Sequence, residues 1–186
     1  MSKRDQILQT AVELFVRQGV ENTPTSQISK VSGVATGTLF HHFPTKEALV
    51  RALVLETKAS LHARVAEALS ESGGFKPALQ AMWAAQIRWA MAHPALFRFK
   101  TRMETLVDID AQTRAELDAM WGEILGFIAS GMANGQFKTM PEDYLFGALN
   151  AQVAFAAEYF IENPKAFADD RLRDQAFESA WASVAA

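Results

Sequence analysis

The chain has 186 residues, of which 49% are hydrophobic, and its 18 Lys and Arg against 21 Asp and Glu give a formal net charge of −3. It contains no cysteine, which excludes disulfides, zinc ribbons, iron–sulfur clusters and thiol catalysis. The N-terminal residues lack the apolar core of a secretory signal, and no stretch approaches the roughly 18 apolar residues of a membrane span. We therefore expect a cytoplasmic protein with no membrane segment, long enough for one compact domain or one plus a small module.

Apolar residues recur three and four positions apart almost throughout, whereas the alternation typical of strands is missing. This pattern predicts an all-α fold of about nine helices. The first helix is expected from about Lys3 to Gln18, with Ser2 as its N-cap and Gly19 as its C-terminal stop.

Two short helices follow, and together they have the make-up of a helix-turn-helix. The first is expected to be capped by Thr25, to present Ile28 and Val31 to the core and to end at Gly33. The second is expected to span about Thr36–His42. Its N-terminal residues are small and polar, as in a recognition helix that enters a major groove.

A fourth helix is expected over about Lys46–Leu69, with Thr45 as its cap after Pro44. Its length is sufficient to link two bodies. We therefore predict a helix-turn-helix domain in residues 1–46 and a helical domain in residues 47–186. Further helices are expected at about Pro77–Ala92, Ala95–Arg102, Asp110–Ala133, Pro141–Glu162 and Asp170–Ser183.

Several residues of the first domain have side chains suited to DNA. Thr38 offers a hydroxyl to base edges and a methyl to thymine, while Gly37 lets the helix end approach the duplex closely. Lys46 begins the fourth helix, where its ammonium and the unpaired backbone N–H groups can meet one phosphate. The candidate DNA-contacting residues are Thr25, Ser26, Thr36, Gly37, Thr38, His41, His42 and Lys46.

Some of these residues also have purely structural explanations. Thr25 and Thr45 are explained equally well as helix caps. His41 and His42 are adjacent, so they point about 100° apart on a helix and do not form a shared metal site. The apolar residues of the segment are expected in the core: Leu39, Phe40 and Phe43.

A longer pattern joins these residues to the first helix. It comprises Ile7-Leu8, Ala11, Leu14-Phe15, Gly19, Ile28, Ser32-Gly33-Val34 and the run from Thr36 to Leu49. Over about residues 4–53 this pattern closely resembles the TetR family of bacterial one-component transcriptional regulators. The resemblance implies that Gly37 and Thr38 touch bases, and that Thr25, His42 and Lys46 meet backbone phosphates. Two positions depart from the family, which often has tyrosine at Phe40 and His42; a phosphate contact from His42 would depend on pH.

The resemblance also implies a homodimer on a palindromic site in double-stranded DNA, and a small-molecule effector held by the C-terminal body. In the expected helix Pro141–Glu162, a stripe of small residues at Gly147, Ala151 and Ala154 is compatible with close approach of a second helix. Packing within one chain explains this stripe equally well.

Aromatic and methionine residues are concentrated after residue 75, and most are expected to form the core. Some of them could line an apolar cavity, the usual make-up of a small-molecule site. The candidate lining residues are Trp89, Phe99, Met103, Trp121 and Phe155, with Arg102, Glu104 or Gln152 as polar anchors.

The residues of the first domain predict a sequence-specific DNA-binding regulator with no metal or other cofactor. The resemblance implies a repressor that an apolar small molecule releases from its operator. An enzyme is disfavoured because the sequence suggests no Ser-His-Asp set, no glycine-rich phosphate loop and no His-Glu-x-x-His motif. A helical protein-interaction module, or an activator lacking an inducer, stays open. Residues 1–50 carry only five Lys and Arg against four Asp and Glu, a weak basic excess for a DNA-binding head.

Overall fold

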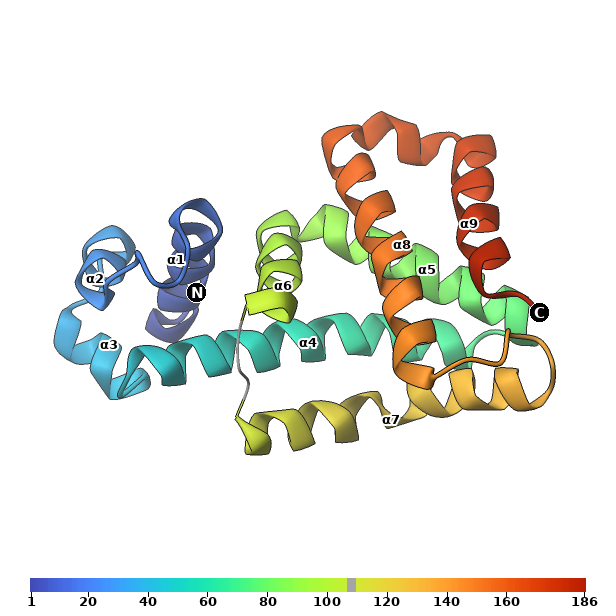
Figure 1. Cartoon of the computed structure of the whole chain (residues 1–186). Helices are drawn as coiled ribbons and strands as arrows, with labels where there is room; N and C mark the ends of the chain where they lie inside the picture. The colour runs from blue at the N-terminus through green and yellow to red at the C-terminus, as the bar shows by residue number, and fades with distance from the viewer. Residues whose placement is uncertain (107–109) are drawn as a thin grey trace. The chain divides into compact units, whose positions relative to one another are not determined.

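The computed structural model describes residues 1–106 and 110–186, with side chains described for residues 1–103 and 110–186. Nine α-helices and one short 3-10 helix occur in these ranges, which confirms the all-α prediction (Figure 1). Within the same ranges, no helix combines the length and apolar character that a membrane span needs. Packing divides the chain into a first unit, residues 1–58 with 95–113, and a second unit, residues 59–94 with 114–186.

The first unit contains the four N-terminal helical segments and one helix from further along the chain. These are α1 (Lys3–Gln18), α2 (Thr25–Ser32), α3 (Thr36–His42), the first half of α4 (Lys46–Ser70) and α6 (Pro94–Leu106). The packing boundary lies on α4 after residue 58, beyond the predicted domain limit at residue 46. The division into a domain of residues 1–46 and a domain of residues 47–186 stays a prediction.

The ends of α1 follow from local chemistry, as predicted. The Ser2 hydroxyl accepts a hydrogen bond from the Asp5 N–H at 3.1 Å, and the Ser2 N–H donates to the Asp5 carboxylate at 3.0 Å. These two bonds form a capping box. At the other end, Gly19 takes a φ of 86°, a backbone conformation that glycine adopts without strain.

Three predictions about α2 and α3 are wrong. Thr25 is the first residue of α2 and not its cap: the cap position is Pro24, which has no side-chain oxygen. Val31 is 57% exposed, because the buried face of α2 is set by Ile28 and Ser29, and Val31 lies about 110° round the helix from their midpoint. Phe40 is 41% exposed, since Leu39 occupies the core-facing position of α3.

Packing in the first unit ties α6 to α1. The rings of Phe15 and Phe99 stack with their centroids 6.1 Å apart, and both residues are buried. A guanidinium nitrogen of Arg102 donates to the backbone carbonyl of Val16. Because the sequence predicts α6 only as residues 95–102, its full extent and its contact with α1 are findings of the structure.

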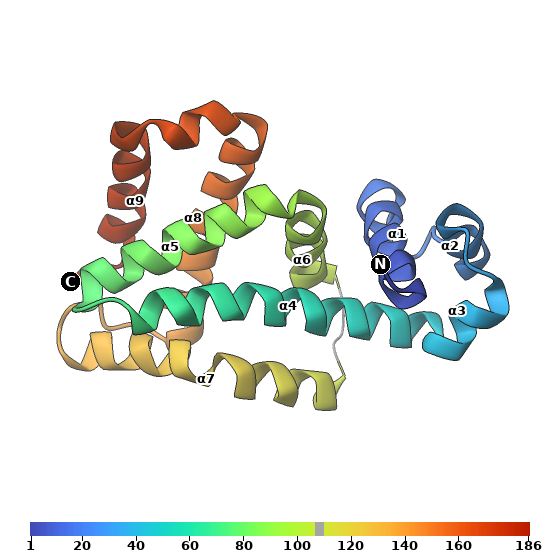
Figure 2. The same ribbon diagram turned by 180° about the vertical axis from the view of Figure 1, so that it is seen from behind.

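The second unit is built mainly from α5 (Phe75–Ala92), α8 (Glu142–Glu162) and α9 (Asp170–Val184), which pack against one another (Figure 2). The rest of α4 and most of α7 (Ala111–Ala133) complete it, and the 3-10 helix Pro164–Ala168 joins α8 to α9. Aromatic residues form much of the core of this unit: the Trp83 ring lies 5.9 Å from that of Phe177 and 6.5 Å from that of Phe160.

Candidate nucleic-acid interface

The turn between α2 and α3 sets the angle between these helices. Gly33 ends α2 in the left-handed conformation, with a φ of 67° and its N–H bonded to the Ser29 carbonyl. The next residue, Val34, is buried together with Ile28 and Leu39. One apolar contact from each helix and one from the turn therefore fix the pair, as a helix-turn-helix requires.

The side of α3 that points away from this core is open to solvent. Five residues of α3 are exposed, Thr36, Gly37, Phe40, His41 and His42, and we call them the α3 face; Thr38 beside them is half-buried.

No contact among the described residues explains why glycine stands at position 37. A Cβ atom built there would meet no atom within 4 Å, and its φ is not in the left-handed region. Glycine inside a helix costs about 1 kcal/mol relative to alanine. The missing side chain thus leaves room for something outside the chain.

The start of α4 lies next to the α3 face along the chain. The Thr45 hydroxyl accepts a hydrogen bond from the Ala48 N–H at 3.1 Å, so Thr45 caps α4 as predicted. The ammonium of the half-buried Lys46 lies 3.4 Å from the backbone carbonyl of Glu21. A phosphate bound by Lys46 would replace this long contact with a charge-assisted one.

Thr25 is half-buried and Ser26 exposed, both in the first turn of α2. A hydrogen-bond network that the sequence did not reveal holds this turn in place. The Gln18 side-chain amide donates to the Gln27 side-chain oxygen at 2.7 Å and to the Thr23 hydroxyl at 3.2 Å. Thr23 is fully buried and donates to the Gly19 carbonyl at 2.6 Å. These polar pairs join residues up to nine positions apart, and no spacing rule predicts them.

Arg4 is a second residue that the sequence did not single out. Its guanidinium lies over the Phe43 ring, 5.5 Å from the centroid, and forms an ion pair with Glu56. The contact links α1 to the end of α3 and to α4, so Arg4 positions the α3 face without belonging to it.

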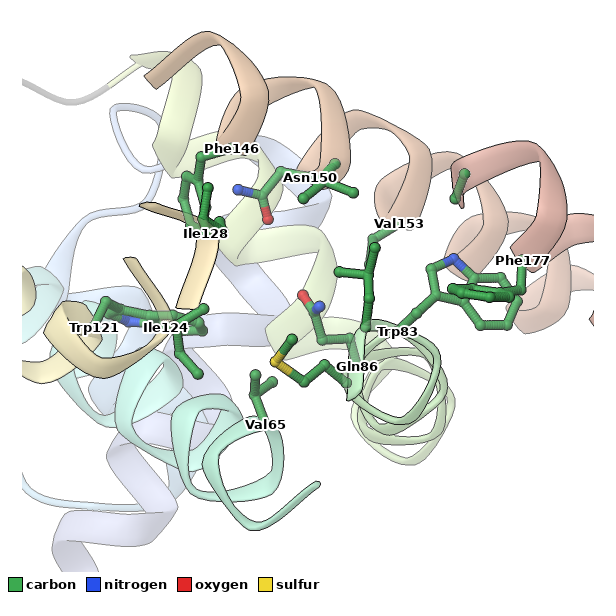
Figure 3. A pocket seen from close by; sticks show the side chains of 14 residues that line it. Val65, Trp83, Gln86, Trp121, Ile124, Ile128, Phe146, Asn150, Val153 and Phe177 are labelled. Atoms are coloured by element: carbon green, nitrogen blue, oxygen red, sulfur yellow. The ribbon is translucent and has the colours of Figure 1, made fainter. Parts of the chain in front are cut away.

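The second unit contains a cavity of about 40 Å³ (Figure 3). Its 14 lining residues come from α4, α5, α7, α8 and α9, and all of them belong to the second unit. Trp121 is the one predicted lining residue among them.

The other predicted lining residues lie elsewhere. Trp89 donates from its indole nitrogen to the Ser60 hydroxyl at 3.0 Å. Gln152 is half-buried and Phe155 is 76% exposed, both on α8. Phe99, Arg102 and Met103 belong to the first unit, and the side chain of Glu104 lies outside the described residues. Ligand contact by these residues stays a prediction.

Two polar lining residues, Gln86 and Asn150, were not predicted. A signal for them exists in the sequence. Gln86 ends the series Leu79, Met82, Trp83, Gln86, and Asn150 belongs to the series Phe146, Leu149, Asn150, Val153. Both series follow the i, i+3, i+4, i+7 spacing of one helix face, so each amide stands at a position that is otherwise apolar.

One side of α8 carries large exposed rings. Tyr144 is 67%, Phe155 76% and Tyr159 43% exposed, and their spacing of 11 and 4 residues puts them on one helix face. Of the predicted small-residue stripe, Gly147 and Ala151 are exposed and Ala154 is half-buried. Exposed rings around small residues form a surface that a second apolar surface would cover.

Comparison with known proteins finds relatives of the N-terminal helices and of the whole chain. Residues 7–53 match the family described as bacterial regulatory proteins, tetR family. A solved structure assigned to the TetR family of transcription regulators, from Shewanella sp. PV-4, is 32% identical, covers 100% of both chains and has a TM-score of 0.89. The HTH-type transcriptional repressor KstR2 of Mycolicibacterium smegmatis is 28% identical over 143 residues, 74% of this chain and 68% of that protein. The HTH-type transcriptional regulator UidR of Escherichia coli is 38% identical over 64 residues, 34% of this chain and 33% of that protein.

Proposed function

This chain belongs to the TetR family of bacterial regulatory proteins and is a DNA-binding regulator of transcription, and from that premise we propose that it is a repressor. It binds a palindromic operator in double-stranded DNA as a homodimer, and a small apolar molecule releases it. Its place of action is the bacterial cytoplasm, where the DNA lies.

The α3 face, and Gly37 in particular, carries this proposal. A helix that gives up stability for an open position, on its solvent side, is suited to close approach of a duplex. Next to that opening, Thr38 reads a base edge in the major groove. The contact with the bases extends to Thr36 and His41. The phosphates are held by four residues that set the register of the protein on the duplex: Thr25, Ser26, His42 and Lys46.

The exposed rings on α8 support the homodimer. Tyr144, Phe155 and Tyr159 would leave water if a second copy packed against the same face. A two-fold pairing presents two α3 helices to half-sites about one helical turn of DNA apart, which a palindromic operator supplies.

The cavity of the second unit supports the effector. Its lining includes Val65 of α4, and the N-terminal end of the same helix carries Lys46. A ligand that binds more tightly to the DNA-free state shifts the equilibrium away from the operator, whereas equal affinity for both states shifts nothing.

The test is binding of the purified protein to the DNA that flanks its own gene, compared with a scrambled duplex over a salt series. A repressor should prefer the flanking DNA by about a thousandfold or more and show a steep salt slope. Weak and equal binding to both duplexes would contradict a self-regulating repressor and favour the helical protein-interaction module.

A further inference from the structure

The cavity of the second unit is apolar except for two side-chain amides. Gln86 on α5 and Asn150 on α8 line it together with aliphatic and aromatic residues. Figure 3 shows both amides directed into the space between the two helices. Neither side chain forms a hydrogen bond with another residue in the part of the chain that the structure describes.

Two residues of the lining also carry a buried indole nitrogen that lacks a partner among the described residues. The indole nitrogens of Trp83 and Trp121 are buried, and no described residue accepts a hydrogen bond from either. An indole N–H only donates, whereas an amide both donates and accepts. Both indole nitrogens have almost no accessible surface, so the side-chain donors that can reach a ligand oxygen in the cavity are the amide N–H groups of Gln86 and Asn150.

Charge limits the ligand further. No charged residue is among the described residues that line the cavity. An ionised carboxylate or ammonium would lose its hydration without finding an opposite charge, which costs far more than the burial of a neutral polar group. The lining thus disfavours fatty carboxylates and organic cations alike.

From these observations we infer that the cavity binds an uncharged, largely apolar molecule whose carbonyl or hydroxyl oxygen accepts hydrogen bonds from Gln86 and Asn150. The inference rests on the proposed function, because this molecule is the effector that releases the operator. A volume of about 40 Å³ holds only a few water molecules. The ligand therefore enters by displacing side chains, and the flexible Met82 in the lining is suited to move.

The test uses four eight-carbon probes that differ only at the polar end: 2-octanone, 1-octanol, octanoate and octylammonium. Their dissociation constants are measured with the full chain at pH 7.5 by tryptophan fluorescence and by calorimetry. The two neutral probes should bind at least tenfold more tightly than either ion. Octanoate or octylammonium binding as tightly as 2-octanone, or no binding of the neutral probes, would overturn the inference.

Three variants locate the polar contact. Gln86→Leu and Asn150→Leu should each weaken 2-octanone binding about three- to tenfold, the usual range for one hydrogen bond. Gln86→Glu should reverse the preference, so that octylammonium binds more tightly than 1-octanol. Gln80→Leu, which replaces an exposed amide of α5 outside the lining, is the control and should leave probe binding unchanged.

Circular dichroism establishes that each variant is folded. Unchanged probe binding in both folded Leu variants would overturn the assignment of the amides. The affinity of the parent chain for its operator is measured separately, without probe. If the parent chain does not bind DNA, the proposed function is contradicted, whereas the inference about the class of ligand is unaffected. If 2-octanone binds but leaves DNA affinity unchanged, release by this ligand class is contradicted.

Discussion

The polar side chains that we assign to binding point outward in the first unit and inward in the second. In the first unit the α3 face presents small and polar residues outward around Gly37, and no contact with a described residue explains a glycine at this position. In the second unit Gln86 and Asn150 point inward, into an apolar cavity. An outward surface is suited to a large charged partner such as DNA, whereas two half-buried amides in an apolar cavity are suited to a small neutral molecule. A substitution in the α3 face should therefore leave ligand binding intact, and a substitution of Gln86 or Asn150 should leave operator binding intact.

The largest direct effect on DNA contact is expected for Gly37→Leu. The Cβ of the new side chain meets no described atom within 4 Å, and the substitution removes the helix cost of glycine, so the melting temperature should stay the same or rise. Operator affinity should fall by about 100-fold, the upper end of what a lost base contact costs. Both are measured by thermal unfolding and by a DNA-binding titration.

Gly122→Leu on α7 is the control, because a Cβ there also meets nothing within 4 Å. It should gain stability without losing DNA affinity. If Gly37→Leu binds the operator as tightly as the parent chain does, the α3 face does not contact DNA.

Phe155→Arg should break the dimer. As an exposed residue of a monomer it should change the free energy of unfolding by no more than about 0.5 kcal/mol. In a two-fold interface the unpaired charge costs roughly 3 to 5 kcal/mol, so the dimer affinity should fall about 100-fold or more. Sedimentation over a concentration series measures this, with the exposed α7 variant Ala119→Arg as control. A dimer of parental strength in Phe155→Arg would place the interface elsewhere.

Thr38→Ala should sharpen the comparison at the level of sequence specificity. Loss of its hydroxyl and methyl contacts should cost roughly 1 to 3 kcal/mol on the operator and much less on random DNA. Competition between operator and scrambled duplexes measures the ratio. A parallel loss on both duplexes would make Thr38 a phosphate contact and not a base contact.

Lys46→Ala should weaken binding to all duplexes about equally and make the salt slope less steep by about one for each protomer. The chain offers a matched control in Lys165→Ala, an exposed lysine of the second unit. An unchanged salt slope in Lys46→Ala would show that its ammonium stays with the Glu21 carbonyl when DNA is bound.

The smallest effect concerns the capping box of α1. Hydrogen bonds from the N–H and hydroxyl groups of Ser2 lower the pKa of the Asp5 carboxyl. A lowered pKa in the folded state means that the stabilisation is present above the unfolded pKa of about 3.9 and is lost as the pH falls below it. The melting temperature of Asp5→Asn should therefore lie slightly below that of the parent at pH 7, and the two should converge near pH 2. If the two melting temperatures still differ at pH 2, the effect of the substitution comes from packing and not from the charge of Asp5.

Most of the fold follows from signals that act within a few residues. Ser2, Gly19, Gly33 and Thr45 are predictable as helix ends because a cap or a left-handed turn is decided by the local backbone. Thr25 fails by one position, since Pro24 also satisfies the geometry of a helix start.

The residues that the sequence misassigns depend on contacts between helices. Val31 and Phe40 are apolar at plausible core spacing, but their neighbours Ile28 and Leu39 take the buried positions. In the sequence, Phe99 and Trp121 look alike as aromatic residues of the body. Their roles differ because α6 packs on α1: Phe99 stacks on Phe15, whereas Trp121 lines the cavity.

Selection of bound duplexes from a pool of random sequences tests the central claim most directly, because every possible operator competes in the same pool. The account predicts enrichment of one palindrome whose half-sites lie about 10 base pairs, or a multiple of that, apart centre to centre. It also predicts that Gly37→Leu enriches this palindrome far less than the parent chain does. A pool that stays random with the parent chain, or a Gly37→Leu variant that enriches the same palindrome as strongly as the parent, would contradict the claim that the α3 face reads DNA.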